Sequence, residues 1–419
     1  MRTIKKWGNT LLMVSLVALM AVPAMAGKEV QKDGVKHIMN SATPEKGNRV
    51  VQLEEEWRVG GEDGEDFFGV ITQVRIGDDG LIYLLDTRLS EVPVYSKDGE
   101  RLSTLSREGD GPGETRMPTN MLFMPDGSLG LVQMFPGKVI KVQADGTPMG
   151  SFQPGGADPT AGGFLQMYDC IINDSDIVVT AESIKSGGPT GQERANYVAS
   201  FDSEGQELVR YFENAYSWDF TNFEFDEAKL ARVDFRKVAA GPDGRVYINT
   251  TRNEYQITVY NRDGSVDRVI EREYESRPRT DEEYNSLVST VTAQLAQIPN
   301  AKITMSKLDP DLAGLNFGPD GNLWVGNSRS GRDQPDGIMT TWDVFTPDGH
   351  FVETVSAACP GDGEKDIIIW TPDGAAVQVT GFTEGVEALR NQNGGGGGGE
   401  DDGEEAEPME VIYLRVASN

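Results

Sequence analysis

The chain has 419 residues with a formal net charge of −29 at pH 7, and it contains only two histidines and two cysteines. A surface this acidic repels nucleic acid and anionic lipid head groups, so DNA or RNA binding is not expected. The scarcity of histidine and cysteine also argues against histidine general-base catalysis and against a Cys/His zinc site.

The first 26 residues have the three parts of a secretory signal peptide. These are a positive N-terminal part, an apolar stretch and a small-residue cleavage site, found at Arg2, Lys5 and Lys6, at 11–22 and at Ala24-Met25-Ala26. The apolar run is shorter than the roughly 18 residues that span a bilayer, so we expect cleavage after Ala26. No cysteine stands directly after this cleavage site, where a lipid anchor would be attached. No later segment is apolar enough to span a membrane. A periplasmic or secreted protein, monomeric and without a lipid anchor, is therefore expected.

Residues 27–48 are interpreted as an N-terminal linker, and the strand-like runs that follow are each succeeded by a turn ending in Asp-Gly. Such a turn between apolar runs is the strongest short-range hairpin signal, because glycine tolerates the positive φ that a tight turn needs. One series of turns ends at Gly80, Gly127, Gly244, Gly321 and Gly374, with Asn173-Asp174-Ser175 in the remaining place. A second series ends at Gly99, Gly146, Gly205, Gly264 and Gly349. The shortest spacings match the roughly 40–50 residues of a four-stranded propeller blade.

These turns divide the chain into six units, whose first strands are ITQVRI, NMLFM, MYDCII, KVAA, LNF and DIIIW. The sixth unit ends with EVIYLRV at 410–416 and lacks a fourth strand, whereas RVVQLEEEWRV at 49–59 has no partner. Because a ring must pair its edges, we expect these two strands to pair. The prediction is an all-β, six-bladed β-propeller of four-stranded antiparallel blades over residues 49–419, with two packed sheets as the alternative.

The repeat, with the loop REGDGPGE at 107–114, resembles the NHL-type repeat of six-bladed propellers. It is especially similar to exported bacterial six-bladed propeller proteins with a GDGPGE signature. The resemblance covers about residues 50–270 and is weaker in the last two units. It implies the fold and a structural role for the aspartate at Asp86, but no single activity, since such propellers serve many roles.

Strand order places the Asp-Gly turns on one face of the ring and the long insertions on the other. The insertions are at 104–118, 154–166, 182–197, 214–235, 272–313, 327–340 and 383–408. Functional residues concentrate in loops on a rigid scaffold, so we expect the site on this second face.

Three insertions have recognisable content. In 272–313, a capping box at Thr280 and Glu283 predicts a helix over about 280–297, either a lid on the ring or a partner-binding helix. The 214–235 segment is rich in aromatic residues and either stacks a ligand or forms a satellite core. The glycine-rich and acidic stretch at 391–409 is expected to be disordered.

Polar residues at the channel mouth are the candidate site. Oxygen ligands suited to Ca²⁺ occur at Gln73, Asn120, Asp169, Asn316 and Asp366. Candidate contacts to an organic ligand, several of them arginines that suit a carboxylate, are Asp86, Arg88, Arg107, Arg116, Trp218, Arg236, Arg252, Asn327 and Arg329. Each of these also suits a structural role. REGDGPGE itself precedes a strand rather than a helix, so we interpret it as a connector and not as a phosphate site.

Two hypotheses follow from these residues. The first is an exported, non-enzymatic propeller that binds an envelope protein, peptide or glycan through the long-loop face and needs no cofactor. The second is a Ca²⁺-dependent hydrolase or lyase with carboxylate and amide ligands at the channel mouth. His37 and His350 lie away from that mouth in the predicted topology, and Cys170 and Cys359 fall in different units, so a disulfide between them is possible but not expected.

Overall fold

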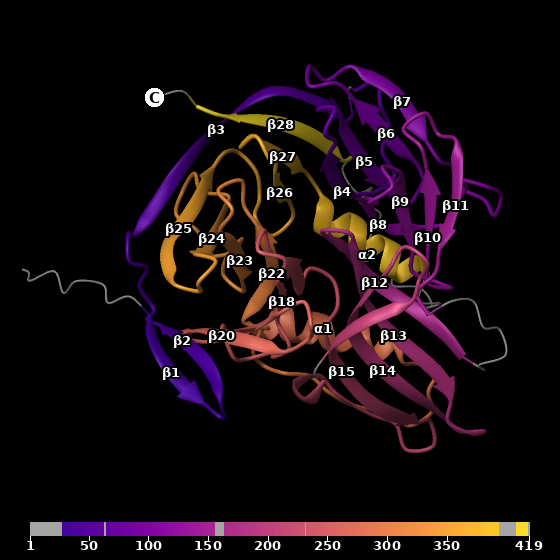
Figure 1. Ribbon diagram of the computed structural model, residues 1–419, viewed down its shortest axis with the longest axis vertical. Helices are drawn as coiled ribbons and strands as arrows, with labels where there is room; N and C mark the ends of the chain where they lie inside the picture. Colours follow the sequence, from indigo (N-terminus) through magenta and orange to yellow (C-terminus); the bar gives the residue numbers. More distant parts are fainter. Residues whose placement is uncertain (1–26, 63, 156–162, 231, 394–407, 418–419) are drawn as a thin grey trace, which may run out of the picture.

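The computed structural model describes residues 27–419 apart from 63, 156–162, 231, 394–407 and 418–419. The predicted signal peptide at 1–26 and most of the glycine-rich stretch at 391–409 lie outside the described residues. Within the described part, no helix is long and apolar enough to cross a membrane. Strands dominate, and their sheets stand around a common centre in a β-propeller (Figure 1).

Three sheets are simple four-stranded antiparallel meanders, with the first strand of each on one edge. They are β4 (Ile71–Ile76), β5 (Ile82–Asp86), β6 (Val92–Tyr95) and β7 (Arg101–Leu105); β8 (Pro118–Phe123), β9 (Leu129–Gln133), β10 (Lys138–Val142) and β11 (Pro148–Phe152); and β12 (Gly163–Asn173), β13 (Asp176–Ser186), β14 (Gly191–Phe201) and β15 (Glu207–Asp219). The predicted first strands ITQVRI, NMLFM and MYDCII lie in β4, β8 and β12, and NMLFM extends one residue beyond β8.

The remaining sheets contain the later units and both ends of the described chain. Their strands are β17 (Val238–Ala240), β18 (Val246–Ile248), β19 (Gln256–Tyr260) and β20 (Val266–Arg272); β22 (Leu312–Phe317), β23 (Leu323–Asn327), β24 (Thr340–Phe345) and β25 (Phe351–Ala358); and β26 (Ile367–Trp370), β27 (Ala376–Val379) and β28 (Glu410–Val416). The long strand β3 (Asn48–Gly60) joins the last two groups into one eight-stranded sheet.

Strand β3 pairs with two different sheets along its length. Its first half runs parallel to β25, with Asn48 opposite Thr354. Its second half runs antiparallel to β28, with Gly60 opposite Glu410. The predicted pairing of 49–59 with 410–416 is therefore present, and the parallel pairing with β25 is an addition that the repeat pattern did not indicate.

The segment interpreted as a linker, 27–48, contains a β-hairpin. Strands β1 (Lys28–Lys32) and β2 (Val35–Asn40) pair across the two-residue turn Asp33-Gly34, in which both residues have positive φ. Strand β2 then adds in parallel to β20. The turn is the same Asp-Gly signal that marks the repeats, but the parallel partner lies more than 200 residues away, so a local pattern does not reveal it.

The Asp-Gly turns have the geometry expected of them. All ten glycines of the two series have positive φ, and Asp174 takes this conformation in the turn that lacks glycine. In most of these turns the aspartate side chain accepts a hydrogen bond from the backbone two residues later, as Asp79 does from Leu81 N and Asp320 does from Asn322 N. Aspartate and glycine together therefore set each strand reversal.

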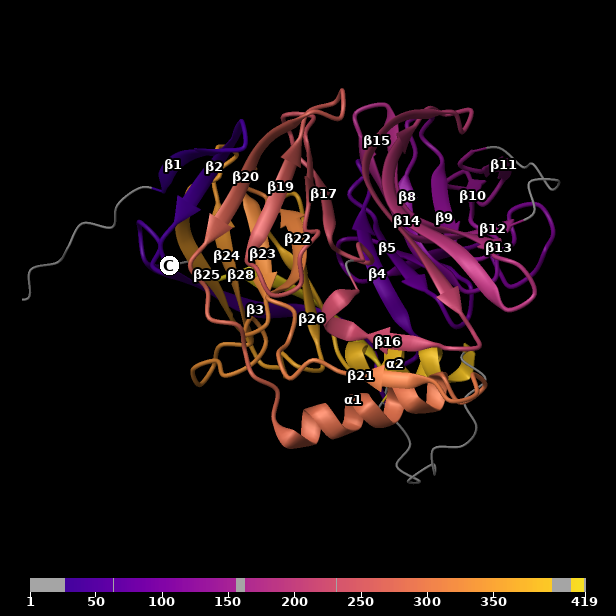
Figure 2. The same cartoon turned by 90° about the horizontal axis from the view of Figure 1, so that it is seen from below.

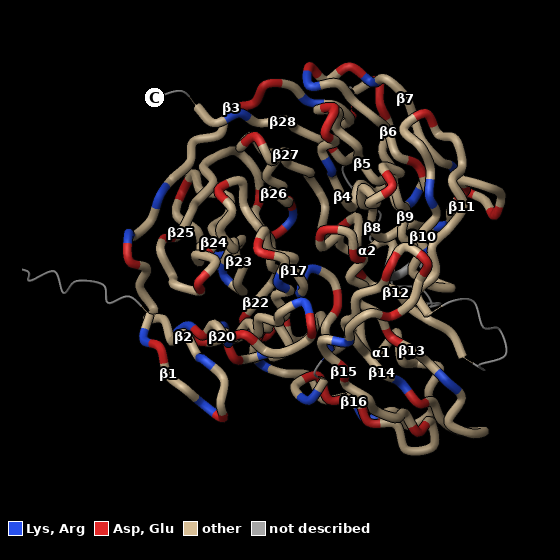
Figure 3. The backbone as a smooth tube through the Cα atoms, viewed as in Figure 1, with Lys and Arg blue, Asp and Glu red and all other residues tan. Residues whose placement is uncertain are grey.

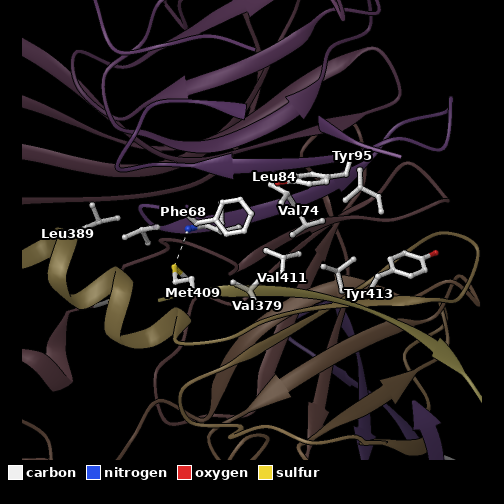
Figure 4. Close-up of a cluster of buried hydrophobic side chains, with 13 residues drawn as sticks. Phe68, Val74, Leu84, Tyr95, Val379, Leu389, Met409, Val411 and Tyr413 are labelled. Atoms are coloured by element: carbon white, nitrogen blue, oxygen red, sulfur yellow. Dashed lines mark hydrogen bonds between the residues drawn. The ribbon is translucent and has the colours of Figure 1, made fainter. Parts of the chain in front are cut away.

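Neighbouring sheets pack through apolar side chains, as between the β4–β7 sheet and the β26–β28 group (Figure 4). Val74 and Leu84 on one side meet Val379 and Val411 on the other. Helix α2 (Phe382–Asn393) joins this core through Leu389. The helix was not predicted, because Gly385 interrupts the sequence and a glycine run follows.

Insertions gather on one face of the ring (Figure 2). Helix α1 (Asp281–Gln294) begins at Thr280, whose capping box with Glu283 is complete, so the predicted helix at about 280–297 is confirmed. Strands β16 (Glu224–Asp226) and β21 (Lys302–Thr304) pair in parallel and tie the 214–235 insertion to the 272–313 insertion. We call residues 272–313 the lid.

Candidate functional site

A cavity of about 690 Å³ lies within the ring. Its walls come from the inner strands of five sheet groups: β4, β12, β17, β22 and β26 (Figure 1). Loop residues Asp309 and Pro310 at the end of the lid complete the wall. Pockets of this size typically hold small ligands.

Six residues predicted from the sequence converge on this cavity, from different strands and loops. They are Gln73, Asp169, Arg236, Asn316, Asn327 and Asp366. A seventh lining residue with functional chemistry, Arg75, was missed. It lies two positions after Gln73 in β4, and alternation along a strand turns both side chains to the same face, so the period of two would have found it.

Three of the described arginines line the cavity: Arg332, which pairs with Glu283 and Asp309, and Arg75 and Arg236. Arg75 Nε donates to the Met121 carbonyl oxygen at 3.1 Å, and the Arg236 guanidinium lies 4.9 Å from the centre of the Phe382 ring in α2. Among the described residues, neither guanidinium forms an ion pair with a carboxylate. Figure 3 shows basic segments near the centre of the ring as well as on its rim.

One carboxylate lies near both arginines. Asp169 is 9% exposed and accepts hydrogen bonds from Cys170 N at 2.8 Å, from Arg236 N at 3.3 Å and from Asn120 Nδ2. Burial raises the pKa of this carboxyl group, and the hydrogen bonds and Arg75 oppose that rise. Its oxygens are thus held by backbone and amide donors and not by either guanidinium.

Burial also lowers the pKa of Arg75 and of Arg236, and Asp169 opposes this in both cases. The positive charge of Arg75 lowers the pKa of Arg236 further. Arg236 is exposed and lines the cavity. The positive charges of the two guanidiniums oppose each other, and Asp169 is the carboxylate that acts on both.

The backbone at Arg236 is strained. Its φ is 60°, in the left-handed region that non-glycine residues seldom occupy. Its carbonyl oxygen accepts from Leu315 N at 2.8 Å and its N–H donates to Asp169, so both backbone groups are held. Strain of this kind gathers at functional sites.

Arginines at the mouth of the cavity have carboxylate partners. Arg279 binds Glu227 at 2.7 Å and Asp309 at 2.8 Å, and Arg277 binds Asp309 and Glu283. Arg252, a predicted contact, also binds Glu227, at 2.6 Å. We call these six residues the mouth network; it fastens the lid to the 214–235 insertion.

Several predicted contacts lie away from the cavity. Asp86 is fully buried and accepts from the backbone N–H groups of Gly69, Val70 and Leu89, which is the structural role that the resemblance implied. Arg88 is exposed and does not line the cavity. Arg329 donates to the Glu275 carbonyl oxygen at 2.7 Å. Asp86 ends β5 and points into the protein, whereas Arg88 and Arg329 lie in the turns after β5 and β23.

The charged side chains of the connector REGDGPGE pair with one another and with Arg116, two residues beyond it. Arg107 pairs with Glu114, and Arg116 pairs with Asp110 and Glu108, so both predicted arginines are occupied within the loop. Glu114 also accepts from Gly111 N at 2.8 Å. The loop is a self-contained connector, as expected.

The aromatic segment is a satellite cluster and not a channel wall. Trp218 belongs to β15; the Arg194 guanidinium covers its ring at 3.7 Å, and the edge of Phe223 packs at 5.2 Å. Phe223 is 2% exposed. Arg194 thus covers one face of Trp218, and the ring belongs to an aromatic cluster outside the cavity lining.

The predicted oxygen ligands do not fit a calcium ion, which needs about six to eight oxygens. Asp366 already accepts from Gly381 N, Asp362 N and Gln378 Nε2, and Asp169 has two guanidiniums nearby that repel a cation. Among the described residues, no group of three or more His, Cys, Asp or Glu side chains could hold a metal. Cys170 and Cys359 are free and buried.

No protein-family model matches the chain, and no curated protein matches it either. A solved structure from Bacteroides fragilis, described as an exported protein, is 10% identical, with 88% of this chain and 100% of that chain covered at a TM-score of 0.47. A gluconolactonase from Xanthomonas campestris is 12% identical, with 86% of this chain and 99% of that chain covered at a TM-score of 0.43. The calcium-binding protein regucalcin from Agrobacterium tumefaciens is 10% identical, with 88% of this chain and 97% of that chain covered at a TM-score of 0.42. Likeness at this level carries no argument about activity.

Proposed function

We propose that this chain is an exported, six-bladed, NHL-like propeller that binds a ligand of the cell envelope in its central cavity without transforming it. In this proposal the pairing of β3 with β28 closes the ring, and the long-loop face admits a peptide, a glycan or the end of a protein. The signal-like N-terminal segment supports export.

The observation that carries the proposal is the convergence of polar side chains from different strands and loops on one cavity of about 690 Å³. A structural role alone does not require six polar residues to face a common space. The rigid ring holds them in place, and the lid and α2 lie at the face where a ligand enters (Figure 2).

Binding without catalysis agrees with the chemistry of the walls. Neither histidine lines the cavity, and the lining carboxylates Asp169, Asp309 and Asp366 accept hydrogen bonds from protein groups, while Glu364 lies 3.6 Å from Arg332. The calcium-dependent alternative requires a cation beside two guanidiniums. Elemental analysis of the purified mature protein tests it directly: stoichiometric calcium lost on Asp169→Asn substitution would favour the enzyme.

Filling the cavity tests the binding proposal. Gly326 in β23 lines the cavity, and a Cβ atom there would meet nothing closer than 3.7 Å. Gly326→Leu is therefore expected to occupy the cavity while leaving the fold intact. The matched control is Ser103→Leu on the outer strand β7, which is exposed.

Immobilised mature protein is incubated with enzymatic digests of envelope material, and the retained compounds are identified by mass spectrometry. The wild type and Ser103→Leu are expected to retain the same compound unchanged, and Gly326→Leu to retain none of it. Equal retention by all three proteins would contradict a cavity site. Recovery of a converted compound would contradict binding without catalysis.

A further inference from the structure

Arg75 and Arg236 form a pair of like charges that the described protein does not neutralise. Arg75 comes from β4 and Arg236 lies two positions before β17; both line the same cavity, and the positive charge of Arg75 lowers the pKa of Arg236. Other arginines bind carboxylates, as Arg194 binds Glu182 and Arg272 binds Asp343. Holding two unpaired guanidiniums at a strained backbone costs stability.

We propose that this pair, with the apolar walls around it, is the binding site for a small organic anion, whose oxyanion group lies between the two guanidiniums. The proposal rests on the proposed function and specifies its ligand. An anion relieves the repulsion between Arg75 and Arg236, and guanidinium groups bind oxyanions through paired hydrogen bonds.

The cavity walls indicate an organic body attached to the anionic group. Apolar residues on the inner strands alternate with the polar ones along the lining: Ile171, Val238, Leu315, Ile367 and Ile369. An inorganic ion would leave these walls in contact with water, whereas a hydrocarbon or ring would cover them. Phe382 of α2 lies against Arg236 and adds an aromatic surface beside the site.

Asp169 sets the limit on the charge that the site accepts. Its carboxylate lies near both arginines but is hydrogen-bonded to Cys170 N, Arg236 N and Asn120. These three charges together leave one positive charge for a ligand, because the other charged lining residues, Asp309, Arg332, Glu364 and Asp366, have ion-pair or hydrogen-bond partners of their own. A monoanion such as a carboxylate or sulfonate therefore matches the site better than a dianion.

The test uses the mature protein and four probes: phenylacetate, benzenesulfonate, the uncharged benzyl alcohol and inorganic sulfate. Thermal unfolding is followed in buffer of constant ionic strength, and affinity is measured by isothermal titration calorimetry. Phenylacetate or benzenesulfonate is expected to raise the unfolding midpoint by about 2 °C or more at saturation. Benzyl alcohol and sulfate are expected to have no such effect.

The variants separate a binding role from a structural one. Arg236→Gln and Arg75→Gln are expected to unfold at or above the wild-type temperature without a probe, and to lose at least about tenfold in affinity for the organic anions. Lysine at either position keeps the charge and is expected to retain part of the affinity. Arg88→Gln is the control, since Arg88 is exposed, outside the cavity and likewise without an ion pair among the described residues.

Three outcomes would overturn the inference: no response to either organic anion, an equal response to sulfate, or an unchanged response in both glutamine variants. Retention of a neutral envelope compound by the wild type, lost in Gly326→Leu, would at the same time uphold the proposed function. Failure of that retention as well would overturn both.

Discussion

At the mouth of the ring, Arg252, Arg277 and Arg279 each bind carboxylates, whereas in the cavity Arg75 and Arg236 have no such partner among the described residues. The two groups of arginines belong to one scaffold and differ in the source of the negative charge that pairs with them. In the mouth network the protein supplies both signs of charge, so the arginines hold insertions together. In the cavity, Asp169 is the only described carboxylate whose charge acts on Arg75 and Arg236, which leaves positive charge for a ligand.

The comparison shows how to separate structural from functional arginines in an acidic protein. With 67 acidic and 38 basic residues, carboxylates are abundant, and most arginines have one within reach. An arginine that faces the cavity and has no carboxylate partner is therefore a candidate for ligand binding. Substitutions in the mouth network and in the cavity separate the structural role from the binding role.

Breaking the mouth network should have the largest effect. The side chain of Arg279 is 5% exposed, and Arg279→Met leaves Glu227 and Asp309 short of a partner in a buried setting. We expect a loss of about 3–5 kcal/mol in the free energy of unfolding, measured by urea denaturation. The lid should also become sensitive to limited proteolysis. A loss below about 0.5 kcal/mol, as for an ordinary surface substitution, would show that the network does not hold the lid.

Acid should release the lid before the rest of the ring. Burial raises the pKa of Glu227, but hydrogen bonds from Arg279 and Arg252 outweigh it and hold that pKa at about 2. A hydrogen bond from Arg277 holds Glu283 at about 2 as well. Because both folded pKa values lie below the ordinary value of 4.5, their contribution is present above about pH 4.5 and is lost as the pH falls towards 2.

Hydrogen exchange measured between pH 6 and pH 2.5, with rates corrected for the chemical effect of pH, checks this. Amides in 272–313 should lose protection at a higher pH than amides in β5 or β9. Simultaneous loss everywhere would argue against the mouth network as a separate acid-sensitive element.

Removing the cavity carboxylate should strengthen anion binding. Asp169→Asn removes the charge that competes with a ligand; its single acceptor oxygen can keep the hydrogen bond from Cys170 N but not also the one from Arg236 N. We expect an affinity for phenylacetate about three- to tenfold higher, roughly 1 kcal/mol. Since the pKa of Asp169 is raised, wild-type affinity should increase as the pH falls through that pKa, and the variant should lack this dependence. Weaker binding by the variant at neutral pH would contradict the arrangement of charges.

Changes in the REGDGPGE loop should have the smallest effect. The Arg107 side chain is 76% exposed and that of Arg116 is 50% exposed, and both pair only within the loop. Exposed pairs contribute little, so Arg107→Gln and Arg116→Gln should leave both the unfolding midpoint and probe affinity unchanged. A clear loss of affinity in either variant would move the site outward to this loop.

Local signals in the sequence predicted much of the scaffold. The Asp-Gly turns located the strand reversals, because one residue's φ decides each of them, and Thr280 with Glu283 located α1. The pairing of β2 with β20 and of β16 with β21 was missed because the partners are distant in the chain and parallel. Pairings of this kind depend on the assembled ring and leave no short-range pattern.

The candidate site was predicted in outline only. Residues at strand entrances, such as Asp169 and Arg236, do reach the cavity, because the inner strands line it. At the ends of the second strands the outcome is mixed, because Asn327 lines the cavity whereas Asp86 and Arg88 do not. Which arginines have carboxylate partners depends on contacts across the ring, and the distinction between Arg75 and Arg279 is invisible without the fold.

The most direct measurement is a co-crystal structure with 4-bromophenylacetate, in which anomalous scattering locates the bromine without bias. The account predicts a bromine peak inside the cavity and carboxylate oxygens about 3 Å from nitrogen atoms of both Arg75 and Arg236. No peak at saturating concentration, or a peak outside the cavity with both guanidiniums unoccupied, would contradict it.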